Sequence, residues 1–254
     1  KEDGKLLYTR EGAHSRPRIL FHEDITGKEI TSKLLAQIKT RKNIQIMEYT
    51  TMTDILISKG ACAGIEAETS DHKKIYIHAD QTIFASGGIG GRYQHSTNFP
   101  HLTGDAIDIA KKHGIRLEHL DYVQIHPTTL YSKKPGRRFL ISESVRGEGA
   151  LLYDKNGNRF IDELLPRDVV TKAIQEQMKK DGTLEKIAKE IILSHFPNIY
   201  QHCLEEGYDA TKEWIPVVPA QHYFMGGIWV DSDSHTSMPN LYAVGETSCN
   251  GVHG

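Results

Sequence analysis

The sequence predicts a mixed α/β (α+β) fold in which one domain is inserted into another. Residues 1–120 alternate between helical and strand patterns, the middle is mixed and rich in polar residues, and β character returns after Pro216. An α/β run that resumes after a mixed segment is typical of an inserted domain. The 254 residues, 38% apolar and 25% charged, suffice for one large or two ordinary domains with a buried core.

Two helices and a series of short strands are predicted in the first half of the chain. Apolar residues at helical spacing predict a helix over 28–41, with Thr26-Gly27 supplying cap chemistry before it. A second helix is predicted over 105–113, and Gly114 is placed to end it. Short β-rich runs bounded by turn residues predict strands at 44–47, 53–57, 63–67, 74–78 and 81–85.

The second half is predicted to hold a tight turn, two helices and two strands. The run from Asp154 to Asn158 is a strong turn signal. An amphipathic pattern predicts a helix over 168–180 whose apolar side comprises Val169, Ala173, Ile174 and Met178. The remaining elements are a helix at 184–193 and strands at 227–230 and 241–244.

Charge, hydropathy and cysteine content argue against several classes of protein. A net charge of −2 gives no global attraction to nucleic acid or to an anionic membrane. No stretch approaches the roughly 20 apolar residues of a membrane span. Three separated cysteines without CxxC spacing favour a reducing cytoplasm over a disulfide framework or a metal site; they are Cys62, Cys203 and Cys249. Because the chain opens at Lys1 without methionine and stops at Gly254 without a closing helix, we expect an internal part of a longer protein.

Two strand ends carry residues suited to a cofactor. Gly87 and Gly88 follow a predicted strand and would let the backbone approach a bound phosphate or ring, although an ordinary tight turn would look the same. The strand over 241–244 runs directly into Gly245 and Glu246. Ligands of α/β sheets bind beyond the carboxyl ends of strands, and a carboxylate there can accept hydrogen bonds from ribose hydroxyls. A polar turn is the alternative explanation.

Polar side chains concentrate in four segments of the middle region. Taken singly, each has a structural explanation; Glu143 and Arg146, for example, could be a helix ion pair three residues apart. Taken together they supply two cations, two imidazoles and several hydroxyls, as binding of a dicarboxylate requires. The segments are 124–129, 142–149, 166–168 and 221–227.

Eight short strings occur in one order along the chain and resemble the succinate dehydrogenase/fumarate reductase flavoprotein family. They are ASGG (85–88), TGDAIDIA (103–110), QIHPTTL (124–130), SESVRGEGA (142–150), PRDVV (166–170), HYFMGG (222–227), LYAVGE (241–246) and GVHG (251–254). Within the family, LLPRDVV and VVPAQHY are most similar to the L-aspartate oxidase branch. The resemblance implies a partial FAD-binding domain at 1–121 and 225–254, with an inserted α+β capping domain at 122–224.

The resemblance also implies roles for individual residues. Arg167, Glu143 and Arg146 are expected to form the catalytic proton relay and its electrostatic support. Substrate carboxylates are expected to bind His126, Thr128, Ser142 and His222. FAD is expected to contact Ser86, Gly87, Gly88, Asp105 and Glu246, and no metal is expected.

The activity implied is FAD-dependent oxidation of L-aspartate to iminoaspartate by hydride transfer to flavin N5, with oxygen or fumarate as acceptor. The product would feed quinolinate synthesis, the early part of NAD biosynthesis, and quinolinate synthase is a possible partner. The Gly-rich pyrophosphate-binding segment and the carboxylate-binding arginine of the family lie outside these residues, so we expect this chain alone to bind FAD weakly and to turn over little. A fumarate reductase or succinate dehydrogenase flavoprotein, and a non-catalytic folded module, are the alternatives.

Overall fold

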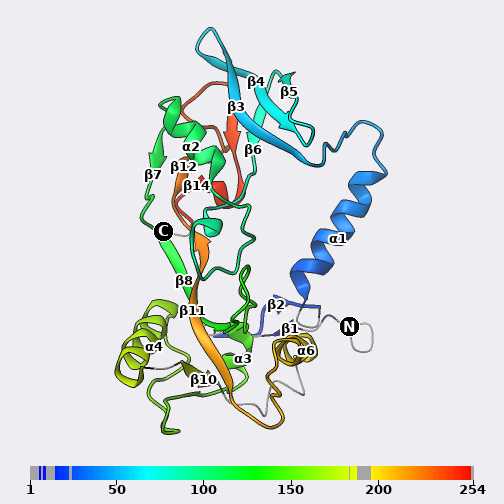
Figure 1. Ribbon diagram of the computed structural model, residues 1–254. Coiled ribbons are helices and arrows are strands. Elements are labelled where there is room, and N and C mark those ends of the chain that lie inside the picture. The colour runs from blue at the N-terminus through cyan, green and yellow to red at the C-terminus, as the bar shows by residue number, and fades with distance from the viewer. Residues whose placement is uncertain are drawn as a thin grey trace. The chain divides into compact units, whose positions relative to one another are not determined.

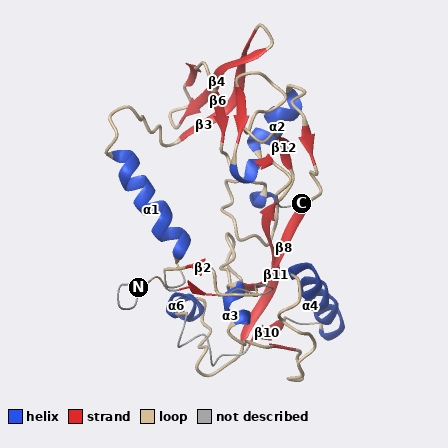
Figure 2. Cartoon of the chain, turned by 180° about the vertical axis from the view of Figure 1, so that it is seen from behind, coloured by secondary structure: helices blue, strands red, loops and turns tan. Residues whose placement is uncertain are grey.

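The computed structural model describes residues 6, 8–9, 15–22, 25–182, 184–187 and 196–252. The chain divides into two compact units, which we call unit 1 and unit 2 (Figure 1; Figure 2 distinguishes helices from strands). Unit 1 comprises residues 1–45 and 125–220, and unit 2 comprises residues 46–124 and 221–254. The expected capping range began and ended close to these boundaries, but residues 1–45, assigned above to the FAD-binding domain, group with unit 1.

Unit 2 contains an antiparallel sheet of β3 (Thr50–Ser58), β4 (Ala61–Thr69) and β5 (Lys74–His78). Lys59 and Gly60 join the first two strands, and both have positive φ, 50° and 80°, as a two-residue hairpin turn of the I′ type requires. These strands confirm three of the predicted runs. The strand predicted at 44–47 is wrong: those residues belong to no strand, and Ile44 and Ile46 are exposed. An apolar run without a partner strand cannot form a ladder.

Short strands and one helix complete unit 2. Strands β6 (Thr82–Phe84) and β13 (Leu241–Ala243) pair in parallel. Strand β12 (Gly227–Trp229) pairs with β14 (Ser248–Cys249) and with β7 (Leu117–Glu118). The 3-10 turns are η1 (Gly90–Arg92) and η2 (Gly245–Thr247). Helix α2 (Asp105–Lys112) confirms the second predicted helix, and Gly114, with φ of 66°, follows its C-cap residue His113.

Apolar side chains of α2 close the core of unit 2. Ala106 and Ala110 have no exposed surface, and Ile107 and Ile109 are nearly as buried. They belong to one cluster with residues of several strands, among them Ile55 of β3, Phe84 of β6, Ile228 of β12 and Leu241 of β13. The core therefore fixes the strands whose carboxyl ends carry the candidate cofactor residues.

The N-terminal part of unit 1 is a short hairpin and a helix. Strands β1 (Tyr8–Thr9) and β2 (Ile19–Leu20) pair antiparallel, and α1 (Thr26–Lys39) confirms the first predicted helix. None of the residues of α1 is buried, and its apolar residues Ile30 and Leu34 are 56% and 60% exposed. The predicted amphipathic face therefore exists, but no described residue covers it.

A mixed layer of strands and helices forms the rest of unit 1. The sheet order is β8-β11-β10-β9, with β8 (Val123–Leu130) and β11 (Ile215–Phe224) each crossing from one unit into the other along the chain. The short strands are β9 (Leu152–Tyr153) and β10 (Glu185–Ile187). The helices are α3 (Glu143–Gly147), α4 (Arg167–Asp181) and α6 (Pro197–Glu205).

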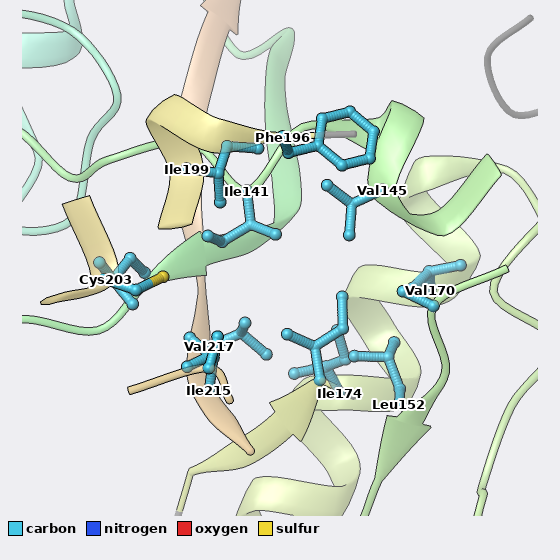
Figure 3. Packing of buried hydrophobic residues seen from close by; sticks show 14 residues of the cluster. Ile141, Val145, Leu152, Val170, Ile174, Phe196, Ile199, Cys203, Ile215 and Val217 are labelled. Atoms are coloured by element: carbon cyan, nitrogen blue, oxygen red, sulfur yellow. The ribbon is translucent and has the colours of Figure 1, made fainter. Parts of the chain in front are cut away.

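Figure 3 shows how these elements share one core, where Ile141, Val145, Val170, Ile174 and Ile215 point toward one another. All five are fully buried. Helix α4 confirms the helix predicted at 168–180, and the turn over 154–158 is also present, with Gly157 at φ 84°. The buried side of α4 is shifted from the predicted one, because Val170 is buried whereas Val169 is 41% exposed.

The helix predicted at 184–193 is wrong where it can be compared. Residues 185–187 form β10, which pairs antiparallel with Ile215–Val217 and with Leu152–Tyr153; residues 188–193 lie outside the described part of the chain. Two neighbouring strands satisfy the backbone groups here, so tertiary pairing overrides local helical propensity. No described helix is long and apolar enough to cross a membrane.

Candidate functional site

Four of the five residues expected to bind FAD meet at one edge of unit 2. Because β6 and β13 are parallel neighbours, their carboxyl ends lie at the same edge. Ser86–Gly88 follow β6, and Glu246 follows β13. The hydroxyl of Ser86 donates to Oγ1 of Thr247 over 3.2 Å, which joins the two strand ends directly.

Gly88 and Glu246 lie so close that any side chain at position 88 would have to displace the Glu246 carboxyl group. A Cβ added to Gly88 would lie 2.5 Å from Oε1 of Glu246, well inside contact distance. The same oxygen accepts a hydrogen bond from the backbone N–H of Phe224 over 2.8 Å. Burial raises the pKa of Glu246, and the hydrogen bond from Phe224 opposes that shift. We call Ser86–Gly88 together with Glu246 the cofactor cradle. It combines backbone that carries no side chain with a partly buried carboxyl group, which fits a nucleotide cofactor with ribityl and ribose hydroxyls.

Asp105, the fifth residue expected to contact FAD, lies at the start of a helix and not at the end of a strand. It is the first residue of α2, is exposed, and accepts a hydrogen bond from the hydroxyl of Thr103 over 2.6 Å. Gly87, at φ 76°, lies against the Leu102 side chain just before this segment, because a Cβ on Gly87 would be 3.2 Å from its Cδ2. The start of α2 is therefore a neighbour of the glycine turn.

A cluster of charged residues lies in unit 1, between the starts of α3 and α4. Nε of Arg167 donates to Oε2 of Glu143 over 2.6 Å, and Nη2 of Arg167 makes a second, shorter contact with the same oxygen. Nη2 of Arg146 lies 3.8 Å from the other carboxylate oxygen of Glu143, in ion-pair range but too far for a hydrogen bond. One carboxylate therefore stands between two guanidinium groups, and one of its two ion pairs joins residues three positions apart, Glu143 and Arg146.

Arg146 is the most buried member of this cluster, with 1% of its surface exposed. Its Nη1 donates to the carbonyl oxygen of Glu163 over 2.7 Å, whereas Nε and Nη2 make no hydrogen bond within the described residues. Burial lowers the pKa of Arg146, Glu143 opposes that shift, and Arg167 adds to it. The cluster therefore holds a cation at a high desolvation cost.

Glu163 supports the cluster and was missed from the sequence. It is 3% exposed, and its carboxylate accepts hydrogen bonds from the backbone N–H of Leu152 over 2.8 Å and from Nη2 of Arg159 over 2.7 Å. Its carbonyl oxygen in turn holds Arg146. The only signal in the sequence is a carboxylate followed by two leucines, which is too common a pattern to be specific.

His126 is almost fully buried in unit 1, and its surroundings define its tautomer. The backbone N–H of Thr128 donates to Nδ1 of His126 over 3.2 Å. A ring nitrogen that accepts a hydrogen bond carries no proton, so the neutral imidazole of His126 has its proton on Nε2. His126 can therefore donate through Nε2, as binding of a carboxylate requires.

Thr128 and Ser142 are both engaged with nearby backbone. The Thr128 hydroxyl donates to the carbonyl oxygen of Ile141 over 3.0 Å, and the Ser142 hydroxyl caps α3 by accepting from the N–H of Ser144 over 3.2 Å. In helix α4, the Thr171 hydroxyl donates to the carbonyl oxygen of Ile125 over 3.3 Å. These contacts bring the His126 strand, the start of α3 and the start of α4 together in unit 1.

His222 belongs to unit 2. Its Nδ1 lies 2.8 Å from Oγ1 of Thr97, and its carbonyl oxygen accepts a hydrogen bond from Nδ2 of Asn98 over 2.9 Å. The expected substrate-binding residues are thus divided between the two units, with His126, Thr128 and Ser142 in the other one. Sequence reasoning did not single out Thr97 or Asn98.

Comparison with known proteins follows this geometry. The FAD binding domain family matches residues 1–254. The L-aspartate oxidase of Clostridium perfringens is 51% identical over 261 residues, covering 100% of this chain and 59% of that protein. That of Clostridium acetobutylicum is 49% identical over 261 residues, covering 100% of the chain and 60% of the protein. The chain therefore spans about three fifths of the length of these relatives.

Solved structures show the same fold. A quinol-fumarate reductase with menaquinol molecules matches with a TM-score of 0.91 and 31% identity, covering 100% of this chain and 49% of that one. A mutant of Escherichia coli quinol fumarate reductase matches with a TM-score of 0.89 and 30% identity, covering 100% and 48%. From the family match over its whole length, together with the cofactor cradle described above, we conclude that the chain belongs to the FAD binding domain family.

Proposed function

We propose that this chain carries the substrate-oxidising part of a flavin-dependent L-aspartate oxidase, which converts L-aspartate to iminoaspartate. The observation that carries the proposal is the cluster of Glu143, Arg146 and the part-buried Arg167. Ser142 directly precedes it, and the Thr128–Ile141 hydrogen bond ties the His126 strand to the residues before α3. Such a set suits an anionic substrate that must also exchange a proton. The similarity to L-aspartate oxidases at 51% and 49% identity supports aspartate as that substrate.

In this proposal unit 1, apart from its first 45 residues, acts as the capping domain, and unit 2 acts as part of the FAD-binding domain. His126 of unit 1 and His222 of unit 2 can each donate a charge-assisted hydrogen bond to a substrate carboxylate, and the Ser142 hydroxyl is a further donor in unit 1. Thr128 acts through its backbone N–H, which fixes the ring of His126. Two well-held carboxylates orient the α-carbon for reaction.

The charged cluster has the electrostatic and proton-transfer role. Arg167 orients and stabilises the anionic substrate, and Glu143 exchanges a proton with the substrate. Arg146 balances the charge of Glu143 at a site where burial already lowers the arginine pKa.

FAD, when bound, supplies the hydride acceptor at flavin N5. Ser86, Gly87, Gly88 and Glu246 would hold it at the shared edge of β6 and β13, with Asp105 at the start of α2 beside them. Oxygen or fumarate would serve as the final acceptor. We further propose that the iminoaspartate enters NAD biosynthesis in the cytoplasm, by way of quinolinate synthase.

The proposal is tested in the full-length protein loaded with FAD. L-aspartate-dependent peroxide production is compared with succinate-dependent dye reduction under identical conditions. Aspartate activity supports the oxidase. Succinate activity alone would favour the second candidate, a fumarate reductase or succinate dehydrogenase flavoprotein, which the 31% identity and TM-score of 0.91 to a quinol-fumarate reductase make the nearest competitor. A protein inactive in both assays would be a non-catalytic module.

A pair of arginine variants sharpens the test. Arg167→Lys loses the two-pronged contact with Glu143, so we expect turnover with aspartate to fall roughly 10- to 150-fold, the equivalent of one charge-assisted hydrogen bond. Arg116→Lys is the matched control, because Arg116 is exposed and pairs with Glu118 in unit 2. Equal effects of the two changes would refute the assigned role. Separately, an FAD absorbance titration of this chain alone should show weak binding.

A further inference from the structure

The segment 95–98 is bound to residues 221 and 222 of unit 2 like a short added strand. Ser96 and Gln221 form a parallel bridge. The N–H of Thr97 donates to the carbonyl of Gln221 over 2.9 Å, and the N–H of Gln221 donates to the carbonyl of His95 over 2.9 Å. The backbone before His222 is therefore fixed from one side by this segment.

Side chains strengthen this attachment. Gln221 is 1% exposed, and its Oε1 accepts hydrogen bonds from the Ser96 hydroxyl over 2.6 Å and from Nδ2 of Asn98 over 3.0 Å. Nδ2 of Asn98 also donates to the carbonyl of His222 over 2.9 Å. Because Asn98 reaches two acceptors with the same nitrogen, the orientation of its amide follows from the network. Buried polar networks of this kind hold their members in one arrangement.

The remaining contact reaches the imidazole of His222. Thr97 is 6% exposed, and its Oγ1 lies 2.8 Å from Nδ1 of His222 but 3.4 Å from the carbonyl oxygen of Gln221. The histidine contact is therefore the stronger of the two. A hydroxyl can both donate and accept, so it serves Nδ1 in either protonation state of the ring.

We propose that Thr97 is a positioning residue that keeps a proton on Nε2 of His222. When the ring is neutral, donation of the Thr97 hydroxyl to Nδ1 over 2.8 Å is favoured over donation to the carbonyl oxygen of Gln221 over 3.4 Å, and this arrangement places the ring proton on Nε2. When the ring is protonated, the hydroxyl accepts from Nδ1, and Nε2 again carries a proton. Nε2 is thus a donor in both states, as a carboxylate ligand needs.

The same tautomer is imposed on His126 in unit 1, where the backbone N–H of Thr128 donates to Nδ1. The two histidines of the proposed carboxylate pair are therefore prepared in the same way by different chemistry. In His126 the donor is backbone and cannot be removed by substitution. In His222 it is the side chain of Thr97, so substitution can test it. The identity of the His222 ligand, a substrate carboxylate, rests on the proposed function, whereas the tautomer of the His222 ring does not.

The tautomer is measured directly on this chain, without cofactor or substrate. Long-range proton–nitrogen spectra of protein labelled with ¹⁵N at its 14 histidines are recorded at about pH 8.5, where most imidazoles are neutral. The His222 signals are identified by their loss in His222→Asn. We expect Nε2 to be protonated in the unchanged chain and in Thr97→Ser, and expect Thr97→Val to shift the ring toward the Nδ1-protonated form.

Thr236→Val is the matched control. Thr236 is also buried in unit 2, at 8% exposure, but its hydroxyl donates to the carbonyl of Leu241 over 2.9 Å and to no histidine in the described structure. It should leave the His222 signals unchanged. If Thr97→Val fails to fold, Thr97→Ala provides the same measurement without the added methyl. An unchanged tautomer in the folded Thr97 variant would overturn the proposal.

Kinetics of the full-length protein separate this inference from the function. We expect Thr97→Val to raise KM for L-aspartate roughly tenfold with little change in kcat, and Thr97→Ser to restore it. If the tautomer changes as expected but His222→Asn leaves KM unaffected, the substrate role of His222 is wrong and the positioning stands. If His222→Asn raises KM but Thr97→Val leaves the His222 tautomer unchanged, the positioning role of Thr97 is wrong and the proposed function stands.

Discussion

Replacing Glu143 by glutamine should destabilise unit 1, because it removes the charge that faces a buried arginine. The carboxylate is 9% exposed and faces Arg146, which is 1% exposed, at 3.8 Å. At an effective dielectric constant of about 20, this separation corresponds to about 4 kcal/mol of attraction. Without it, Arg146 stays buried beside Arg167 with only the weaker Coulombic attraction of Glu163 to offset its charge, so we expect a net loss of about 3 kcal/mol, typical of breaking a buried pair.

The chain contains a suitable fluorescent reporter for unit 1. Of its two tryptophans, Trp214 lies in unit 1, where it stacks on Tyr153 at 4.6 Å, and Trp229 lies in unit 2. In a Trp229→Phe background, urea unfolding followed by fluorescence therefore reports on unit 1. A loss of about 3 kcal/mol corresponds to a melting temperature lower by roughly 6–12 °C for a chain of this size.

Two further variants decide whether charge is the cause. Glu148→Gln makes the same chemical change at an exposed residue next to α3, and we expect it to alter stability by less than about 0.5 kcal/mol. Adding Arg146→Met to Glu143→Gln should recover at least about 1 kcal/mol, because the uncompensated charge is removed. A loss below about 1 kcal/mol for Glu143→Gln, or strict additivity in the double variant, would refute the reasoning.

The remaining predictions concern unit 2 and the core cysteine. Burial tends to raise the pKa of Asp54, but hydrogen bonds from Lys112 and His113 outweigh it and lower the pKa from 3.8 to about 2. The stabilisation from this lowered pKa is present above pH 3.8 and is lost as pH falls through about 2. Asp54→Asn should therefore lower the free energy of unfolding by about 1 kcal/mol at neutral pH, after allowance for solvent screening, and should leave it unchanged below about pH 2. Gly88→Ala should displace Glu246 from its bond to Phe224, costing about 1 kcal/mol in urea unfolding followed by the fluorescence of Trp229 in a Trp214→Phe background, which reports on unit 2, and weakening FAD binding by the full-length protein; unchanged FAD affinity would argue against the cradle. Burial raises the pKa of Cys203 to about 12, so a thiol reagent should modify it only after unfolding, and rapid labelling of the native chain would contradict this.

Elements held together by local turns could be predicted from the sequence. The strands of the β3-β4-β5 sheet were located because Lys59-Gly60 and Ser70-Asp71 separate them clearly. Strands β8 and β11 were missed because Pro127 interrupts the first and Pro216 and Pro219 interrupt the second. Proline is tolerated there only where its missing N–H is not needed for pairing, and sequence alone does not reveal such places.

The candidate site was predictable only through resemblance and in part. In the structure, two adjoining ends of parallel strands bring together Ser86, Gly87, Gly88 and Glu246. Glu143 lies between two arginines. Glu163 and Thr97 act on members of the site through hydrogen bonds made 17 and 125 positions away in the chain. Neither stands in a pattern with a recognisable period, so only folded geometry reveals them.

The uncovered apolar face of α1 has an energetic consequence. Helices of about this length are marginal in water unless a neighbouring surface buries one side, since nucleation is costly and each added residue contributes little. Helix α1 has 14 residues, none of them buried. Its backbone amides should therefore open to solvent at a free energy near zero, long before the packed helices α2 and α4 do, and their protection would rise sharply if any molecule came to lie on Ile30, Leu34 and Ile38.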